Sequence, residues 1–109
     1  MKTTTLGKSP LKVSRLCLGT MMFGDQTPLE DARAIVADAQ EKGCNFIDTA
    51  DVYTLGKSEE IVGQVLKGQR HQWVLASKVG NAMSEEPNHK GYSRSWMLRA
   101  CEGSLRRLD

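Results

Sequence analysis

The sequence predicts an α/β fold in which a small β-hairpin precedes a parallel sheet. Three short runs rich in apolar and β-compatible residues begin at Arg15, Asn45 and Trp73, so 30 and 28 residues separate their starts. A segment with the apolar periodicity of a helix follows each run. Repeated strand–helix units imply parallel strands joined by right-handed crossovers. A length of 109 residues suits one domain, and we expect residues 1–109 to contain no second one.

Two short runs at the N-terminus predict the hairpin. Thr3 to Leu6 and Leu11 to Ser14 flank Gly7-Lys-Ser-Pro10, a run of turn-forming residues. The next segment, Arg15-Leu-Cys-Leu-Gly19, predicts the first strand of the parallel sheet.

The first helix begins near Thr27-Pro-Leu-Glu30, which combines a threonine cap, a proline at the first position and a glutamate three residues after the cap. Gly43 closes this helix. Its predicted apolar face comprises Leu29, Ala32, Ile35, Val36 and Ala39.

The second unit pairs a strand at Asn45-Phe-Ile-Asp-Thr49 with a helix that Ser58 is predicted to cap. The buried stripe of that helix is predicted to be Ile61, Val62, Val65 and Leu66.

The third unit begins with the strand Trp73-Val-Leu-Ala-Ser77. The polar loop from Gly80 to Tyr92 has 13 residues, more than the roughly 2–6 of an ordinary βα connection, and such loops are often functional or mobile. Ser93 is predicted to cap the third helix. The predicted buried face of that helix comprises Met97, Ala100, Cys101, Leu105 and Leu108.

Composition argues against several classes of protein. Fifteen Lys and Arg residues against 13 Asp and Glu leave a net charge of only +2, and the basic residues are scattered, so nucleic-acid binding is not expected. The N-terminus has no apolar leader, and no segment approaches 18 apolar residues, so we expect no membrane association.

The three cysteines, Cys17, Cys44 and Cys101, lie far apart and form no Cys-x-x-Cys pair. This arrangement argues against a disulfide framework and a cysteine-rich zinc site, so no metal is expected. We expect buried or half-buried thiols in a reducing cytoplasm.

An acid, a phenol and an amine follow two successive predicted strands. Asp48 closes the second strand, Tyr53 lies in the loop after it, and Lys78 closes the third. The carboxyl ends of adjacent parallel strands, about 4.8 Å apart, can bring these side chains together. A lysine ammonium lowers the pKa of a nearby phenol, which allows the phenol to protonate a carbonyl oxygen. From spacing alone, an ordinary ion pair beside a packing tyrosine remains the alternative.

The sequence around these residues resembles a known family. Asp48-Thr-Ala-Asp-Val-Tyr-Thr-Leu-Gly-Lys-Ser-Glu59 is similar to the aldo-keto reductase signature D-T-A-x-x-Y-x-x-G-x-S-E, and Ala76-Ser-Lys78 is similar to the segment with the family's catalytic lysine. Leu16-Cys-Leu-Gly-Thr-Met21 resembles the first barrel strand, and Ser104-Leu-Arg-Arg-Leu-Asp109 resembles the third helix. The resemblance implies the N-terminal hairpin and first three βα units of a (β/α)8 TIM barrel.

The family resemblance also implies an activity. It implies reduction of an aldehyde or ketone with NADP(H), with Tyr53 as proton donor, Lys78 tuning its pKa and Asp48 pairing with Lys78. Many members have tryptophan at the position of Met21, which leaves the shape of the substrate pocket open. The residues expected near the nicotinamide-ribose end of the cofactor are Gly19, Thr20, Met21 and Asp48.

Three alternatives have different functional consequences. The Gly56-Lys-Ser58 triplet suggests a P-loop, but Asp51 stands where that motif needs glycine. Potassium-channel β-subunits share the aldo-keto reductase fold, which leaves cofactor-sensitive binding to a partner as an alternative. An inactive truncated product is the third.

The sequence ends before any fourth strand, and the family's catalytic histidine on that strand has no counterpart. His71 and His89 are expected at the surface, with His89 able to approach the mouth of the pocket. We therefore expect an incomplete barrel that is unstable alone, self-associates or requires the rest of the barrel.

Overall fold

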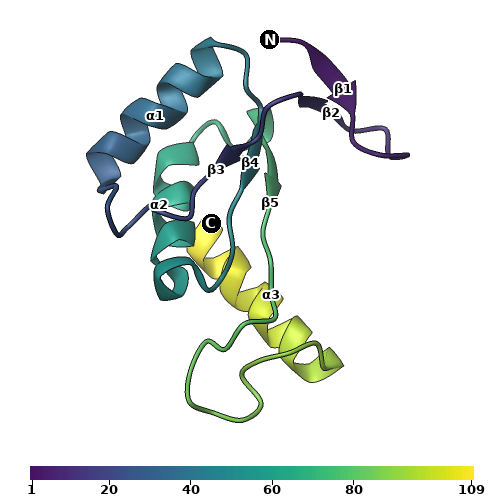
Figure 1. Ribbon diagram of the computed structural model, residues 1–109, viewed down its shortest axis with the longest axis vertical. Helices are drawn as coiled ribbons and strands as arrows, with labels where there is room; N and C mark the ends of the chain where they lie inside the picture. The colour runs from purple at the N-terminus through teal and green to yellow at the C-terminus, as the bar shows by residue number, and fades with distance from the viewer.

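The computed structural model describes residues 1–109 and shows a hairpin beside a three-stranded sheet flanked by helices (Figure 1). In the hairpin, β1 (Thr3–Thr5) pairs antiparallel with β2 (Lys12–Ser14), as the sequence predicts. The Leu6 amide donates to the Leu11 carbonyl at 3.0 Å and closes the turn between the two strands.

The second sheet is parallel, in the order β3-β4-β5. Its strands are β3 (Leu18–Gly19), β4 (Phe46–Asp48) and β5 (Val74–Ala76), and their last residues lie side by side in the register. The predicted strand at 15–19 is reduced to its final two residues, because the Arg15 amide donates instead to the Lys2 carbonyl next to the hairpin. The three strands form an open sheet with β4 at the centre.

Three α-helices and two short 3₁₀ helices complete the fold. They are α1 (Leu29–Glu41), η1 (Tyr53–Gly56), α2 (Lys57–Leu66), η2 (Arg70–Gln72) and α3 (Arg94–Leu108). In Figure 1, α2 lies between α1 and α3, and the long loop before α3 extends away from the sheet. None of the helices has both the length and the apolar character needed to cross a membrane.

One apolar cluster joins α1, α2 and the sheet. Burial of such side chains is the main favourable term in folding, at about 25 cal/mol per Å². Trp73 is part of this cluster, and Trp96 is buried separately on α3. The members of the cluster are Phe23, Ala32, Val36, Cys44, Ile47, Ile61, Val62, Val65, Leu66 and Trp73.

Two of the three predicted helix caps are wrong. At α1, Pro28 occupies the cap position and no side chain caps the helix, because Thr27 instead closes the preceding turn through its backbone bonds with Met22 and Gly24. Ser58 lies inside the first turn of α2, which begins at Lys57. The Ser93 cap is confirmed, since its hydroxyl accepts from the Trp96 amide at 3.1 Å.

The buried stripe of α2 is confirmed, whereas that of α3 is confirmed only at Ala100, which is buried, and at Leu108, which packs against the core. Alpha-3 buries Trp96, Ala100 and Gly103, while Met97 and Leu105 are exposed. The reason is the pair of segments that cover α3: α2 comes close to its C-terminal end at the small Gly63, and His89 of the long loop stacks on Trp96. On α1, Ile35 is likewise exposed.

The expectation for the cysteines is correct only at Cys44, which is buried, whereas Cys17 and Cys101 are exposed.

Gly63 provides a test of this close helix approach. A methyl group at residue 63 would lie 2.6 Å from the Arg107 carbonyl oxygen and 2.9 Å from that of Leu108. Gly63→Ala should therefore destabilise the protein by about 1–3 kcal/mol, although alanine is the better helix former. Urea unfolding would measure the loss.

The matched control is Gly103→Ala on α3. Its nearest contact is the flexible end of the Arg107 side chain, 3.2 Å away, so the added methyl group can be accommodated. We expect this variant to be neutral or stabilised by up to about 1 kcal/mol. Equal losses in the two variants would contradict the close approach.

Candidate active site

Asp48, Tyr53 and Lys78 lie together at the carboxyl edge of the sheet. The Lys78 Nζ atom donates to Asp48 Oδ2 at 2.7 Å and to the Thr49 carbonyl oxygen at 2.7 Å. The same Nζ atom lies 4.8 Å from the centroid of the Tyr53 ring. The structure therefore brings the three predicted side chains into one group, with the ammonium between carboxylate and phenol.

The environment of Lys78 favours its charged form. Partial burial opposes the charge, but the hydrogen bond to Asp48 and the proximity of the Tyr53 hydroxyl outweigh it, so the pKa of Lys78 is raised above its ordinary value. Lys78 is consequently an ammonium throughout the neutral pH range. A permanent positive charge thus lies next to the only phenol in this group.

A strained turn directly follows Tyr53. Tyr53 begins η1, and the next two residues, Thr54 and Leu55, have positive φ values of 49° and 48°. Residues other than glycine rarely adopt this conformation, and such strain often occurs at functional sites. Gly56 follows with φ of 93° and leads directly into α2.

Tyr53 and Lys78 share one cavity. It has a volume of about 240 Å³ and lies between the loop after β4 and the loop after β5. Its lining combines apolar surface with the two polar side chains of the group, as is typical of a small-molecule site. The lining residues are Ala50, Asp51, Val52, Tyr53, Lys78, Val79, Asn81 and Tyr92.

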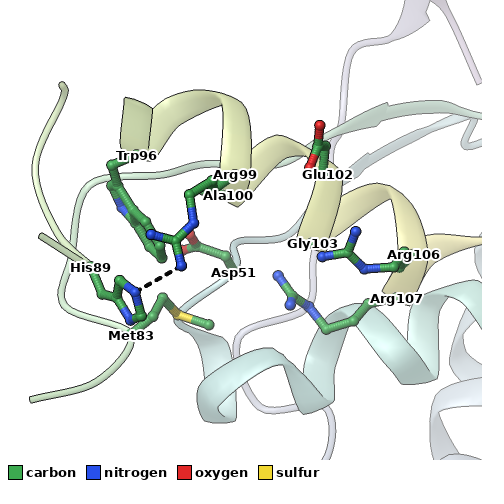
Figure 2. A pocket seen from close by; sticks show the side chains of 10 residues that line it. All are labelled: Asp51, Met83, His89, Trp96, Arg99, Ala100, Glu102, Gly103, Arg106 and Arg107. Atoms are coloured by element: carbon green, nitrogen blue, oxygen red, sulfur yellow. Dashed lines mark hydrogen bonds between the residues drawn. The ribbon is translucent and has the colours of Figure 1, made fainter. Parts of the chain in front are cut away.

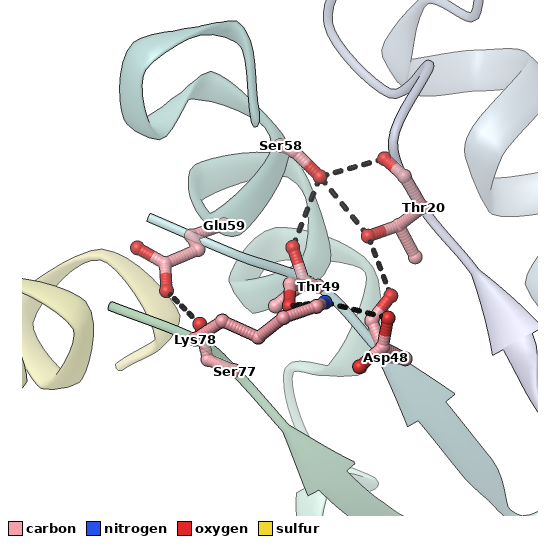
Figure 3. Close-up of polar contacts among 7 residues, drawn as sticks. All are labelled: Thr20, Asp48, Thr49, Ser58, Glu59, Ser77 and Lys78. Atoms are coloured by element: carbon pink, nitrogen blue, oxygen red, sulfur yellow. Dashed lines mark hydrogen bonds and ion pairs between the residues drawn. The ribbon is translucent and has the colours of Figure 1, made fainter. Parts of the chain in front are cut away.

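The sequence reasoning missed two buried polar residues beneath this group, Ser58 and Glu59. Figure 3 shows Ser58 and Glu59, from the first turn of α2, in contact with residues that directly follow the three strands. Both are fully buried. The available signal was spacing, because Ser58 and Glu59 precede Val62 by four and three residues and so continue the buried stripe of α2.

The four residues predicted near the cofactor differ in whether their atoms are free to contact a ligand. Nothing in the chain lies within 4 Å of the position of a side chain at Gly19, and Met21 is 59% exposed. Asp48 uses only Oδ2 in its ion pair, so Oδ1 can accept a further hydrogen bond. The Thr20 hydroxyl is buried, donates to the Asp48 carbonyl oxygen at 3.1 Å and lies 3.0 Å from the Ser58 hydroxyl. Gly19, Met21 and Asp48 therefore leave surface or polar atoms free to contact a ligand, whereas the Thr20 side chain does not.

His89 lies away from this cavity. It stacks on Trp96 with ring centroids 5.0 Å apart, and its Nε2 accepts from Arg99 at 3.0 Å (Figure 2). Since Nε2 accepts, Nδ1 carries the proton and donates to Ser84 Oγ at 2.8 Å. His89 thus connects the long loop to α3. It lines a different cavity, of about 280 Å³. His71 is exposed, as predicted.

Asp51 lies between the two cavities and lines both. It is 2% exposed, and its Oδ2 atom has no hydrogen-bond partner. Burial raises the pKa of Asp51, and nearby Glu59 raises it further, while the Val52 amide and Arg107 act in the opposite direction.

The raised pKa predicts how Asp51 affects stability. A carboxyl group whose pKa is higher in the folded state contributes stability below its unfolded pKa of about 4, and loses it as pH rises through the folded value. Asp51→Asn removes this loss. The free energy of unfolding of the variant, relative to that of the wild type, should therefore increase as pH rises from about 3 to 7.

Denaturant unfolding at several pH values would measure the difference. Asp25→Asn, in an exposed loop, controls for the loss of one negative charge at the surface. A difference between Asp51→Asn and wild type that does not vary with pH would contradict the prediction.

No group of three or more His, Cys, Asp or Glu side chains is placed to hold a metal ion.

Comparison with known proteins identifies the family. Residues 15–109 match the Aldo/keto reductase family. The chain is 38% identical over 112 residues to a rice (Oryza sativa subsp. japonica) protein named probable voltage-gated potassium channel subunit beta, covering 100% of the chain and 34% of that protein. It is 43% identical over 120 residues to the uncharacterized oxidoreductase YrpG of Bacillus subtilis (strain 168), covering 100% of the chain and 37% of that protein.

A solved structure agrees with these matches. The holo form of aldo-keto reductase AKR11C1 from Bacillus halodurans superimposes with a TM-score of 0.84 at 41% identity, covering 99% of this chain and 36% of that one. The chain belongs to the aldo/keto reductase family. It has the N-terminal hairpin and first three βα units of the family's barrel, which confirms the predicted fold, and it spans about a third of the length of the curated relatives it matches.

Proposed function

We propose that the protein containing this chain is an NAD(P)H-dependent oxidoreductase that reduces an aldehyde or ketone to an alcohol. The observation that carries this proposal is the position of Lys78 Nζ, 2.7 Å from the Asp48 carboxylate and 4.8 Å from the centre of the Tyr53 ring. Family membership supports the reaction class.

Tyr53 is the proton donor in the proposed reaction. The cavity that it shares with Lys78 allows a carbonyl oxygen to approach its hydroxyl group. As the oxygen gains electron density, Tyr53 gives up its proton, and the adjacent Lys78 ammonium stabilises the negative charge left on the phenol oxygen. Asp48 keeps Lys78 charged and oriented.

The cofactor assignment rests on exposed or unpaired groups that can contact a ligand. Gly19, Met21 and Asp48 would contact the nicotinamide-ribose end, with the free Asp48 Oδ1 accepting from a ribose hydroxyl. The bound reduced nicotinamide supplies the hydride. NADPH is the form we propose, by resemblance to the family, with NADH as the alternative that the assay must compare.

The test is a turnover assay with the protein that contains this chain. We expect loss of reduced-nicotinamide absorbance when aliphatic and aromatic aldehydes or ketones are added, and formation of the corresponding alcohols in equal amount. Absence of alcohol from every carbonyl compound, in a protein shown to bind NADPH, would sink the proposal.

A second candidate function is cofactor-sensitive binding to a membrane channel. Rice and Arabidopsis thaliana relatives, each 38% identical, are both named probable voltage-gated potassium channel subunit beta. The same assay separates the two functions, because a binding subunit would retain NADPH affinity while producing little or no alcohol. Our first candidate is the enzyme, since Asp48, Tyr53 and Lys78 are all present and in contact.

A further inference from the structure

Three hydroxyl-bearing residues occupy equivalent places beneath the proposed active site. Thr20, Thr49 and Ser77 directly follow the last residues of β3, β4 and β5. Those last residues are neighbours in the register of the sheet, so the three hydroxyl groups lie along one edge. In Figure 3 all three face the first turn of α2.

Ser58 joins the first two of these strand ends. Its hydroxyl donates to the Thr20 carbonyl oxygen at 2.8 Å, and it lies 3.1 Å from the Thr49 hydroxyl and 3.0 Å from that of Thr20. A serine hydroxyl has one proton and a carbonyl can only accept, so the Thr49 hydroxyl must donate to Ser58. Removal of the Ser58 hydroxyl would leave the buried Thr49 hydroxyl without this acceptor.

Glu59 joins the third strand end to α3. Its Oε1 accepts from the Ser77 hydroxyl at 2.5 Å, and its Oε2 accepts from Arg107 Nε at 2.7 Å. The side chain of Glu59 is fully buried, and a buried carboxylate requires this degree of pairing. Two consecutive residues of α2 therefore contact the ends of all three parallel strands.

The same strand ends carry the reactive group. Thr49 follows Asp48 in the chain, and Ser77 precedes Lys78. Thr49 also accepts directly from Lys78 Nζ through its carbonyl oxygen at 2.7 Å. A shift of Thr49 or Ser77 thus changes the separation of Lys78 from both Asp48 and Tyr53. Displacements of about 1 Å in a reactive group can lower a rate by about 100-fold.

We propose that Ser58 and Glu59 are positioning residues, which align the three strand ends and thereby set Lys78 between Asp48 and Tyr53. This inference rests on the proposed carbonyl reduction. It assigns to the Ser-Glu pair of the signature a role distinct from stabilising α2, because both side chains bond to residues outside that helix.

The test compares Ser58→Ala and Ser77→Ala in the protein that contains this chain, with Ser9→Ala in the hairpin turn as the matched loss of a hydroxyl elsewhere. Each variant needs kcat and KM for one carbonyl substrate, the pH dependence of kcat, and a melting temperature. Both site variants should lose about 10- to 100-fold in kcat with a smaller change in KM.

The pH dependence of kcat distinguishes a positioning role from a role in stability alone. The titratable groups around Lys78 are Asp48, Tyr53 and the Cys17 thiol. A Lys78 ammonium that is held less firmly beside Tyr53 makes the phenol a weaker acid, so the alkaline decline of kcat should move to higher pH in both site variants. Ser9→Ala should match wild type in kcat and in pH profile.

Wild-type kcat and an unmoved alkaline decline in the two site variants would overturn the positioning role, even if their melting temperatures fell. If Ser58→Ala does not fold, Ser77→Ala decides the matter, since it leaves the Glu59–Arg107 pair intact. A wild-type protein that reduces no carbonyl compound would overturn the proposed function and this role together. Active wild type with unaffected variants would overturn the role alone.

Discussion

Tyr53→Phe should lower the rate of carbonyl reduction by at least about 100-fold while leaving NADPH binding intact. The substitution removes only the hydroxyl group and keeps the ring that lies against Lys78. A positioned general acid typically contributes about 10²- to 10⁴-fold to a rate, so kcat should fall by that factor. Steady-state kinetics measures the loss, and titration calorimetry with NADPH measures the retained affinity.

Tyr92→Phe is the matched control for Tyr53→Phe. Tyr92 lines the same cavity, so its variant loses the same atom from the same space. Its ring lies against Gly80 rather than beside the Lys78 ammonium, and we expect kcat to remain within about threefold of wild type. Equal kcat values for wild type and Tyr53→Phe would refute the proton-donor role.

Arg107→Leu should cause the largest loss of stability. Arg107 pairs with Glu59 at 2.7 Å, and the Glu59 side chain is 0% exposed. Removal of one partner leaves a carboxylate buried without its counter-ion, which typically costs about 3–5 kcal/mol. The midpoint of urea unfolding should fall while the slope of the transition stays the same.

Two further variants make this prediction specific. Lys57→Met breaks the exposed pair with Glu60, whose members are about half exposed, and should cost about 0–1 kcal/mol. The double variant Arg107→Leu/Glu59→Leu replaces both buried partners with apolar side chains and should recover much of the lost stability. A loss for Arg107→Leu as small as that for Lys57→Met would contradict a buried ion pair.

Local sequence patterns predicted most of the fold. The hairpin, the three strands in parallel order and the buried stripe of α2 all follow from short-range signals in the chain. Most of the α3 face could not be predicted in this way. Periodicity identifies an apolar face but not which neighbouring segment covers it. Residue Gly63 of α2 lies against the C-terminal end of α3, and His89 of the long loop stacks on Trp96.

The candidate site, like the fold, was predicted only in part from the sequence. Strand-end placement and the signature motif predicted that Asp48, Tyr53 and Lys78 would meet, and the structure brings them together. Ser58 was interpreted as a helix cap because a serine before an apolar stripe is a common capping signal. Its actual partners, Thr20 and Thr49, are 38 and 9 residues away in the chain, so no local pattern indicated them.

The sequence by itself thus determined which reactive side chains meet, because an acid, a phenol and an amine directly follow neighbouring strands that its pattern predicts. Only the tertiary structure decided how they are supported. Packing between distant segments produces the contacts of Ser58 and Glu59. It also accompanies the strained turn after Tyr53 and the buried Asp51 Oδ2 atom that has no hydrogen-bond partner. Such contacts depend on the three-dimensional approach of α2 to the strand ends, and neither propensity nor periodicity encodes that approach.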